Sequence, residues 1–237
     1  MLAAALFLAI QIAFSVAAAL SAGTSSIRKI LLSLFLLAAL VFPLQARDPL
    51  AKVGLTLIAL MALIKCVFII NARPEWQTPS RRIWQVLVPF DIRRTRGVPP
   101  GLEWKSLVRI AAATFVVAVV IWLALTQLTA LSGGSLWLAK WVCMLFAAYS
   151  VMEWSGELLR SVHRLVGVAI EPLQRDPIAS RSVAEFWGER WNLPMTRWLN
   201  EFFFRPLARR GHPLVGIVAA FVVSAALHAW LFFAATG

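Results

Sequence analysis

The sequence predicts an all-α, polytopic membrane protein with about six transmembrane spans and further amphipathic helices at the membrane interface. Its 237 residues are 60% hydrophobic and only 14% charged, whereas soluble domains carry about 25% charged residues. Several apolar runs approach or exceed the roughly 20 residues that a helix needs to cross a bilayer. These runs are continuous, and the strands of a transmembrane β-barrel would instead alternate apolar and polar residues.

Six apolar runs are candidate spans, and no repeat or linker divides the chain, so we predict a single domain over residues 1–237. The first run lacks the basic start of a signal peptide and is too long for one, which favours a retained span. The second run is the shortest and ends near Pro43, so we expect it to be tilted or broken. The predicted spans are residues 2–22, 30–45, 53–71, 108–128, 134–153 and 213–234.

The placement of Lys and Arg predicts how these spans are oriented. Nineteen of the 23 basic residues fall in residues 22–29, 72–109 and 154–212, which six spans place on one face of the membrane. Because cytoplasmic loops are enriched in Lys and Arg, we assign that face to the cytoplasm. The net charge of +12 then reflects topology and not nucleic-acid binding, for which no motif is present. The Ala-, Arg- and Trp-rich composition favours a bacterial inner-membrane protein.

The cytoplasmic segments carry amphipathic patterns of their own. Residues 79–92 mix Trp, Leu and Phe with arginines, and residues 194–206 place Trp and Phe near helical spacing after Pro194, which suits a first helical turn. Both patterns predict helices that lie in the interface. Residues 155–170 are expected to continue the fifth span as an amphipathic helix.

Several ionisable or reactive side chains within the apolar runs have a structural interpretation. Lys65 and Lys140 have stems long enough to reach an interface, although Lys65 could instead meet an anionic group. Cys66 and Cys143 have neither metal-ligand nor disulfide spacing, so we expect free thiols. No metal site and no bound cofactor are expected, because no two histidines have the spacing of metal ligands.

His228 differs from these residues, because it is an imidazole inside the last apolar run. An ionisable side chain at membrane depth is costly and is usually functional, and histidine titrates near neutral pH, as a general base must. The small residues 224–226 would allow a helix or a slim substrate to approach. The alternative is a structural imidazole bonded to a neighbouring helix. His163 and His212 are expected to be an interfacial and a loop residue.

A second unusual feature is the segment of residues 186–192, Phe-Trp-Gly-Glu-Arg-Trp-Asn, which ends 36 residues before His228. On a helix, Val183, Phe186 and Trp187 would share a face with Trp191. The segment could therefore be a Trp-anchored interfacial helix, with the final Asn as its C-terminal cap. No phosphate-binding Gly loop, nucleophile elbow, paired-His zinc motif or dinucleotide fingerprint is present.

Together, these residues resemble a known family. The run Ser182–Asn192 is similar to the S-x-x-x-F-W-G-x-R-W-N segment of the wax-synthase-like branch of membrane-bound O-acyltransferases. In that family an apolar helix follows with a histidine after small residues, and Ser224–His228 matches that pattern at a fitting separation. Pro172, Leu173 and Pro177 also resemble the branch, so the resemblance covers about residues 172–233.

The resemblance implies an enzyme that moves an acyl group from acyl-CoA to a hydroxyl acceptor, such as a long-chain alcohol or related lipid, in a chamber within the membrane. It implies that His228 is the catalytic base and that Asn192 orients the acceptor or supports the thioester. It also implies a cytoplasmic CoA-binding mouth shaped by Phe186, Trp187, Arg190 and Trp191.

The chain departs from the family pattern after His228, where members usually continue with further helices. Nine residues follow His228 here, and residues 229–237 contain no Asp or Glu to partner it. Two interpretations stay open: a second subunit, identical or different, completes the chamber, or the chain is a reduced, non-catalytic relative that acts as an assembly partner. A small transporter is a third, weaker hypothesis, because the intramembrane polar residues are few and not repeated.

Overall fold

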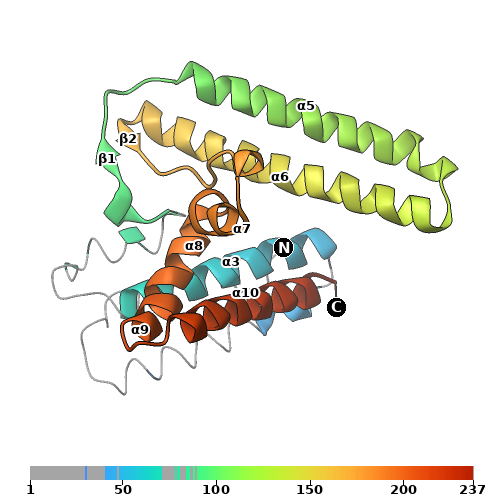
Figure 1. Ribbon diagram of the computed structural model, residues 1–237. Helices are drawn as coiled ribbons and strands as arrows, with labels where there is room; N and C mark the ends of the chain where they lie inside the picture. Colours follow the sequence, from blue (N-terminus) through green and yellow to red (C-terminus); the bar gives the residue numbers. More distant parts are fainter. Residues whose placement is uncertain are drawn as a thin grey trace. The chain divides into compact units, whose positions relative to one another are not determined.

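Figure 1 shows a computed structural model, which describes Ile30 and residues 41–46, 48–70, 78, 80, 84, 85, 88 and 90–236. The predicted spans at 2–22 and most of 30–45 lie outside the described residues, as does most of the predicted interfacial helix at 79–92. The chain divides into two compact units, one of residues 93–196 and the other of residues 1–92 with 197–237. That the chain is a single domain stays a prediction.

The unit of residues 93–196 is built on two long apolar helices, α5 (Trp104–Thr126) and α6 (Gly133–Leu165), which pack side by side (Figure 1). A short 3₁₀ turn, η4 (Leu128–Ala130), joins them. The buried residues of both helices are mostly small: Ser106, Ala113, Ser150, Gly156 and Ser161. Small side chains let helix backbones approach closely, which is how helices pack in lipid.

Both predicted spans in this unit are confirmed as helices, and the fifth runs on as expected. α6 continues through the amphipathic stretch after residue 153 and ends at Leu165, five residues before the predicted end at 170. The chain instead turns at Gly167 (φ +78°) into a short strand, β2 (Val168–Ala169). This strand pairs antiparallel with β1 (Arg96–Gly97), a two-residue contact that the sequence did not predict.

After β2 the chain lies along α6 and forms a series of short turns. A methyl group on Gly156 would come within 3.1 Å of Leu173, so the absence of a side chain there permits this close approach. The turns that follow are η5 (Pro177–Ala179), α7 (Val183–Glu185), the π-helical turn η6 (Phe186–Arg190) and α8 (Leu193–Leu199).

The other unit packs helix α3 (Pro49–Ile70) against α10 (Pro213–Thr236), with the turn η1 (Phe42–Gln45) beside them. Leu55 and Ala59 are buried there with Ala46 and Trp230 packed against them. The chain reaches α10 through a π-helical turn, η7 (Asn200–Phe204), and α9 (Arg205–Ala208). The helical conformation predicted for residues 194–206 is thus confirmed, in three segments and not one.

Three described helices are long and apolar enough to cross a membrane: Trp104–Thr126, Gly133–Leu165 and Pro213–Ala234. Helix α3 also matches the span predicted at 53–71. Its Lys65 is buried and donates a hydrogen bond to the Phe90 carbonyl at 2.6 Å, which supports a structural interpretation of that lysine. The protein is therefore an integral, mostly helical membrane protein.

Candidate active site

Residues 173–196, called the signature loop below, are held together by backbone hydrogen bonds between stretches distant in sequence. The Arg175 N–H donates to the Arg190 carbonyl at 2.8 Å, and the Leu193 N–H donates to the Leu173 carbonyl at 2.7 Å. The 186–192 segment therefore lies directly against the 173–176 segment that enters the loop. Its shape comes from this pairing and not from a regular helix.

Arg190 ties the two sides of the signature loop together. Its Nε donates to Glu185 Oε1 at 2.6 Å, and its Nη1 donates to the Arg175 and Asp176 carbonyls at 3.2 Å each. A guanidinium carries five donors in a fixed plane, so one arginine can bridge several acceptors. Arg190 therefore cross-links the loop, and its part in shaping a CoA-binding mouth stays a prediction.

Glu185 is the acceptor at the centre of this arrangement. Its Oε2 accepts the Arg181 backbone N–H at 2.7 Å while Oε1 accepts Arg190, and its own N–H donates to Ser182 Oγ at 3.0 Å. The last contact is the N-cap of α7. The backbone hydrogen bond from Arg181, and then the hydrogen bond from Arg190, lower the pKa of the Glu185 carboxyl. The carboxylate is therefore ionised at neutral pH.

The aromatic residues of the segment are not equivalent. Phe186 stacks on Trp191 with ring centroids 5.5 Å apart, and Tyr149 stacks on the same indole at 6.4 Å. Trp187 meets Phe186 edge to face and keeps 46% of its surface exposed. Of the three aromatic residues that the resemblance implies as substrate contacts, Trp187 is the most exposed.

Asn192 ends the segment in an unusual backbone conformation. Its φ is +40°, in the left-handed region that residues other than Gly rarely adopt. Asn tolerates this region and is common just after a helix end, which fits the capping role left open by the sequence. Its carbonyl accepts the Thr196 N–H at 2.9 Å. Within the described part of the chain, its side-chain amide makes no hydrogen bond and is only partly buried.

His228 lies on α10, in the other unit. Its Nδ1 is 2.7 Å from the Ser224 carbonyl oxygen, one helical turn earlier. A carbonyl only accepts, so Nδ1 carries the proton and the neutral ring has its lone pair on Nε2. The His228 side chain is exposed in the structure. In a neutral ring this is the tautomer that a general base acting through Nε2 requires, and the helix's own backbone fixes it.

A polar cluster that sequence reasoning missed fixes the loop on the helical hairpin. Arg109 on α5 meets Glu153 on α6 at 2.9 Å and Asp176 in the loop at 3.0 Å, and Gln174 donates to Glu153 at 2.9 Å. Gln174 is buried. The spacing of these residues in sequence carries no recognisable signal, because three separate elements bring them together. No group of His, Cys, Asp and Glu in the described residues could hold a metal ion.

The C-terminal part of this chain, including the 186–192 segment and His228, matches the sequence profile of the membrane bound O-acyl transferase family over residues 170–237. The resemblance inferred from residues 172–233 is therefore confirmed. The family match assigns no role to any single residue of this chain.

Three curated relatives, all from Arabidopsis thaliana, are distantly similar to the chain. It is 35% identical over 80 residues to probable long-chain-alcohol O-fatty-acyltransferase 1, which is 30% of this chain and 24% of that protein. It is 36% identical over 76 residues to probable long-chain-alcohol O-fatty-acyltransferase 3, which is 29% of this chain and 22% of that protein. It is 31% identical over 94 residues to probable long-chain-alcohol O-fatty-acyltransferase 7, which is 36% of this chain and 28% of that protein. The chain thus aligns with about a quarter of the length of these acyltransferases.

Proposed function

We propose that this protein is a membrane-embedded O-acyltransferase that moves an acyl group from acyl-CoA to the hydroxyl of a long-chain alcohol or related lipid. The observation that supports this most strongly is the family match over residues 170–237, which includes both the signature loop and His228. The hydrogen bond that leaves the Nε2 lone pair of His228 available adds a chemical reason.

In this proposal His228 acts as the general base. As the alcohol oxygen attacks the thioester carbonyl carbon, Nε2 accepts the hydroxyl proton and the new C–O bond forms. The C–S bond then breaks, and the CoA thiolate leaves and takes up the proton from His228. No covalent enzyme intermediate is needed, because a thiolate is a good leaving group. The Nδ1–H bond to Ser224 keeps the ring in the required tautomer throughout.

Asn192 is proposed to support the acyl group. Its unoccupied amide can donate a hydrogen bond to the oxygen that becomes negative as the alcohol attacks. The left-handed backbone at Asn192 is fixed by its neighbours, since Thr196 bonds to its carbonyl and to those of Trp187 and Trp191. A donor that is held in place before reaction stabilises developing charge without a cost of reorganisation.

We further propose that the signature loop faces the cytoplasm of a bacterial inner membrane, where CoA thioesters are available. The helical hairpin supports this orientation. Arg109, Arg160 and Arg164 lie toward the end of the hairpin that carries the loop, and residues 127–139 at the opposite end contain no Lys or Arg. Reporter fusions at residues 80 and 190 would report the same face, and opposite faces would reject the orientation.

The experiment that tests the function uses the full chain, purified in lipid, with radiolabelled acyl-CoA and a long-chain alcohol. The wild-type protein is expected to form labelled ester, and His228→Ala is expected to abolish it at unchanged protein level. His212→Ala is the matched control, because His212 is an exposed residue at the start of α10. Ester formation by His228→Ala at the rate of the control would reject His228 as the base.

A second candidate is a non-catalytic assembly partner. The exposed side chain of His228 favours it, because a base in acyl transfer is normally enclosed by protein and the described residues do not enclose this one. This candidate predicts that the purified chain forms no ester with any acyl-CoA and gains activity only with a partner subunit. It also predicts that Asn192→Ala is tolerated in cells.

A further inference from the structure

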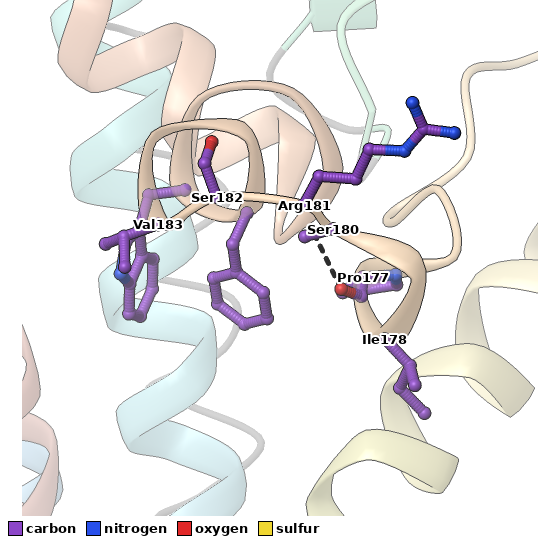
Figure 2. A pocket seen from close by; sticks show the side chains of 8 residues that line it. Pro177, Ile178, Ser180, Arg181, Ser182 and Val183 are labelled. Atoms are coloured by element: carbon purple, nitrogen blue, oxygen red, sulfur yellow. Dashed lines mark hydrogen bonds between the residues drawn. The ribbon is translucent and has the colours of Figure 1, made fainter.

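An open pocket of about 410 Å³ lies in the signature loop, between the η5 turn and the α7–η6 segment (Figure 2). Its lining is divided in chemistry. Ile178, Val183 and Trp187 contribute exposed apolar surface, and Arg181 and Ser182 contribute polar groups. In Figure 2 the side chains of Arg181 and Val183 leave the loop on opposite sides. The pocket therefore has a cationic side and an apolar side.

Arg181 differs from Arg190 in how its charge is used. Both oxygens of Glu185 are occupied, one by the Arg181 backbone N–H and the other by the Arg190 guanidinium. Asp176 is paired with Arg109, and no ion pair joins Arg181 to Asp176 or Glu189 in the described residues. Within the described residues the Arg181 guanidinium has no hydrogen bond and no ion pair, and the side chain is exposed. Its positive charge is thus uncompensated at the edge of the pocket.

The two serines of the pocket also differ in whether their hydroxyl hydrogen is already used by the protein. Ser180 donates its hydroxyl hydrogen to the Pro177 carbonyl at 2.7 Å, the bond drawn in Figure 2. Ser182 Oγ instead accepts the Glu185 N–H at 3.0 Å, which leaves its hydroxyl hydrogen available. Two adjacent residues, Arg181 and Ser182, therefore offer donors that no described group of the protein uses.

We propose that this pocket binds the phosphorylated nucleotide end of the acyl-CoA donor, with Arg181 as the phosphate contact and Trp187 as an apolar face for the base. This inference rests on the proposed function. A guanidinium binds phosphate oxygens through paired, charge-assisted hydrogen bonds, and an exposed indole offers a planar surface on which a base stacks. A neutral alcohol or ester has no anionic group for Arg181. The combination of a free cation with an exposed aromatic ring fits a nucleotide better than either hydrophobic substrate.

The test measures binding and turnover of Arg181→Gln in the full chain reconstituted in phosphatidylcholine nanodiscs. Arg175→Gln is the matched control, because it removes the same charge from an exposed residue that does not line the pocket. The dissociation constant of radiolabelled CoA and the KM for acyl-CoA are expected to rise about tenfold in Arg181→Gln. Both are expected to change less than about twofold in Arg175→Gln. With an acyl-pantetheine thioester, which has no phosphate, Arg181→Gln and wild type are expected to have the same KM.

Several results would overturn the assignment. Equal CoA binding by wild type and Arg181→Gln would reject Arg181 as the phosphate contact. Ester formation by the wild type would still support the proposed function in that case. An equal loss in Arg175→Gln, or a loss with acyl-pantetheine, would show a general charge or structural effect. Wild type and Arg181→Gln are also reconstituted with phosphatidylglycerol in place of phosphatidylcholine. If the substitution weakens only the binding of phosphatidylglycerol and leaves CoA binding unchanged, the phosphate that Arg181 contacts belongs to a lipid headgroup. Failure of the wild type to bind CoA would reject the proposed function itself.

Discussion

The signature loop and the region of α10 around His228 achieve order in different ways. Arg190, Glu185 and the backbone pairing of residues 173–175 with 190–193 hold the loop by contacts between positions far apart in sequence. His228 is oriented by one hydrogen bond to a carbonyl four residues earlier in its own helix. The conformation of the loop should therefore be disturbed by substitutions at many residues. The orientation of the His228 ring should depend mainly on its own hydrogen bond to Ser224.

This contrast separates two kinds of functional residue. The side chains of Arg190 and Glu185 form hydrogen bonds with other groups of the loop, so they are positioning residues. His228 Nε2 and the Asn192 amide make no hydrogen bond in the described structure, which leaves them available to a substrate. Variants of the two kinds of residue should therefore differ in their effects on turnover, substrate binding and stability.

Asn192 should give the largest effect among the residues of the signature loop, because its amide is the proposed donor to the oxyanion. Asn192→Gly keeps the left-handed backbone without strain and removes the amide, whereas Asn192→Ala also adds strain of about 1 kcal/mol. Turnover should fall about 10²- to 10³-fold in both variants if the amide stabilises the oxyanion. Thermal unfolding should show Asn192→Ala as the less stable of the two. Full activity in Asn192→Gly would leave Asn192 only its capping role.

Arg190 should show an intermediate effect that differs from that of a substrate contact. Arg190→Gln and Arg190→Lys both lose the bridge between Glu185 and the two carbonyls. Glutamine lacks the charge, and lysine has a single ammonium group in place of the planar guanidinium. We expect kcat to fall about tenfold or more while the KM for acyl-CoA changes less, since misplacement of reacting groups lowers the rate. Steady-state kinetics measures both values. A rise in KM at unchanged kcat would make Arg190 a CoA contact after all.

Gly216 provides a test of packing in the unit that carries His228. A methyl group there would lie 2.8 Å from the Phe204 carbonyl oxygen, so Gly216→Ala forces α10 and η7 apart at a cost of about 1–3 kcal/mol. Gly54→Ala on α3 is the control, because nothing lies within 4 Å of its added methyl group. Thermal unfolding in lipid should therefore show a lower Tm for Gly216→Ala only. Equal Tm values would contradict the packing of α10 described here.

The smallest effect expected is a pH dependence of the loop. The folded-state pKa of Glu185 is lowered by Arg181 and Arg190. Its contribution to stability is therefore present above the unfolded pKa of about 4.3 and is lost as pH falls through the lower, folded value. The protection factor of the Arg181 amide, which is the exchange rate of an unprotected peptide at the same pH divided by its own exchange rate, should fall in that acidic range in wild type. Glu185→Gln should remove this pH dependence, and a variant that retains it would assign the effect to another group.

The sequence allowed the helices to be predicted better than the loop. The apolar runs that became α5, α6 and α10 are continuous, and composition alone is enough to define a span. The resemblance also pointed to Asn192 and His228, because they lie in a motif. The role of Arg190 could not be predicted, since it depends on residues 175 and 176 folding back onto residue 190. The Arg109–Glu153–Asp176 cluster likewise joins three elements whose separation in sequence follows no pattern.

The most direct test of the central claim, that the Nε2 lone pair of His228 removes the acceptor's proton, is the single-turnover rate of His228→Asn. The asparagine amide can replace the Nδ1–H bond to Ser224 but provides no nitrogen at the Nε2 position. With acyl-CoA binding unchanged, we expect the rate to fall about 10²- to 10⁴-fold. A rate within threefold of wild type would contradict the account, because acyl transfer would then proceed without the proposed base.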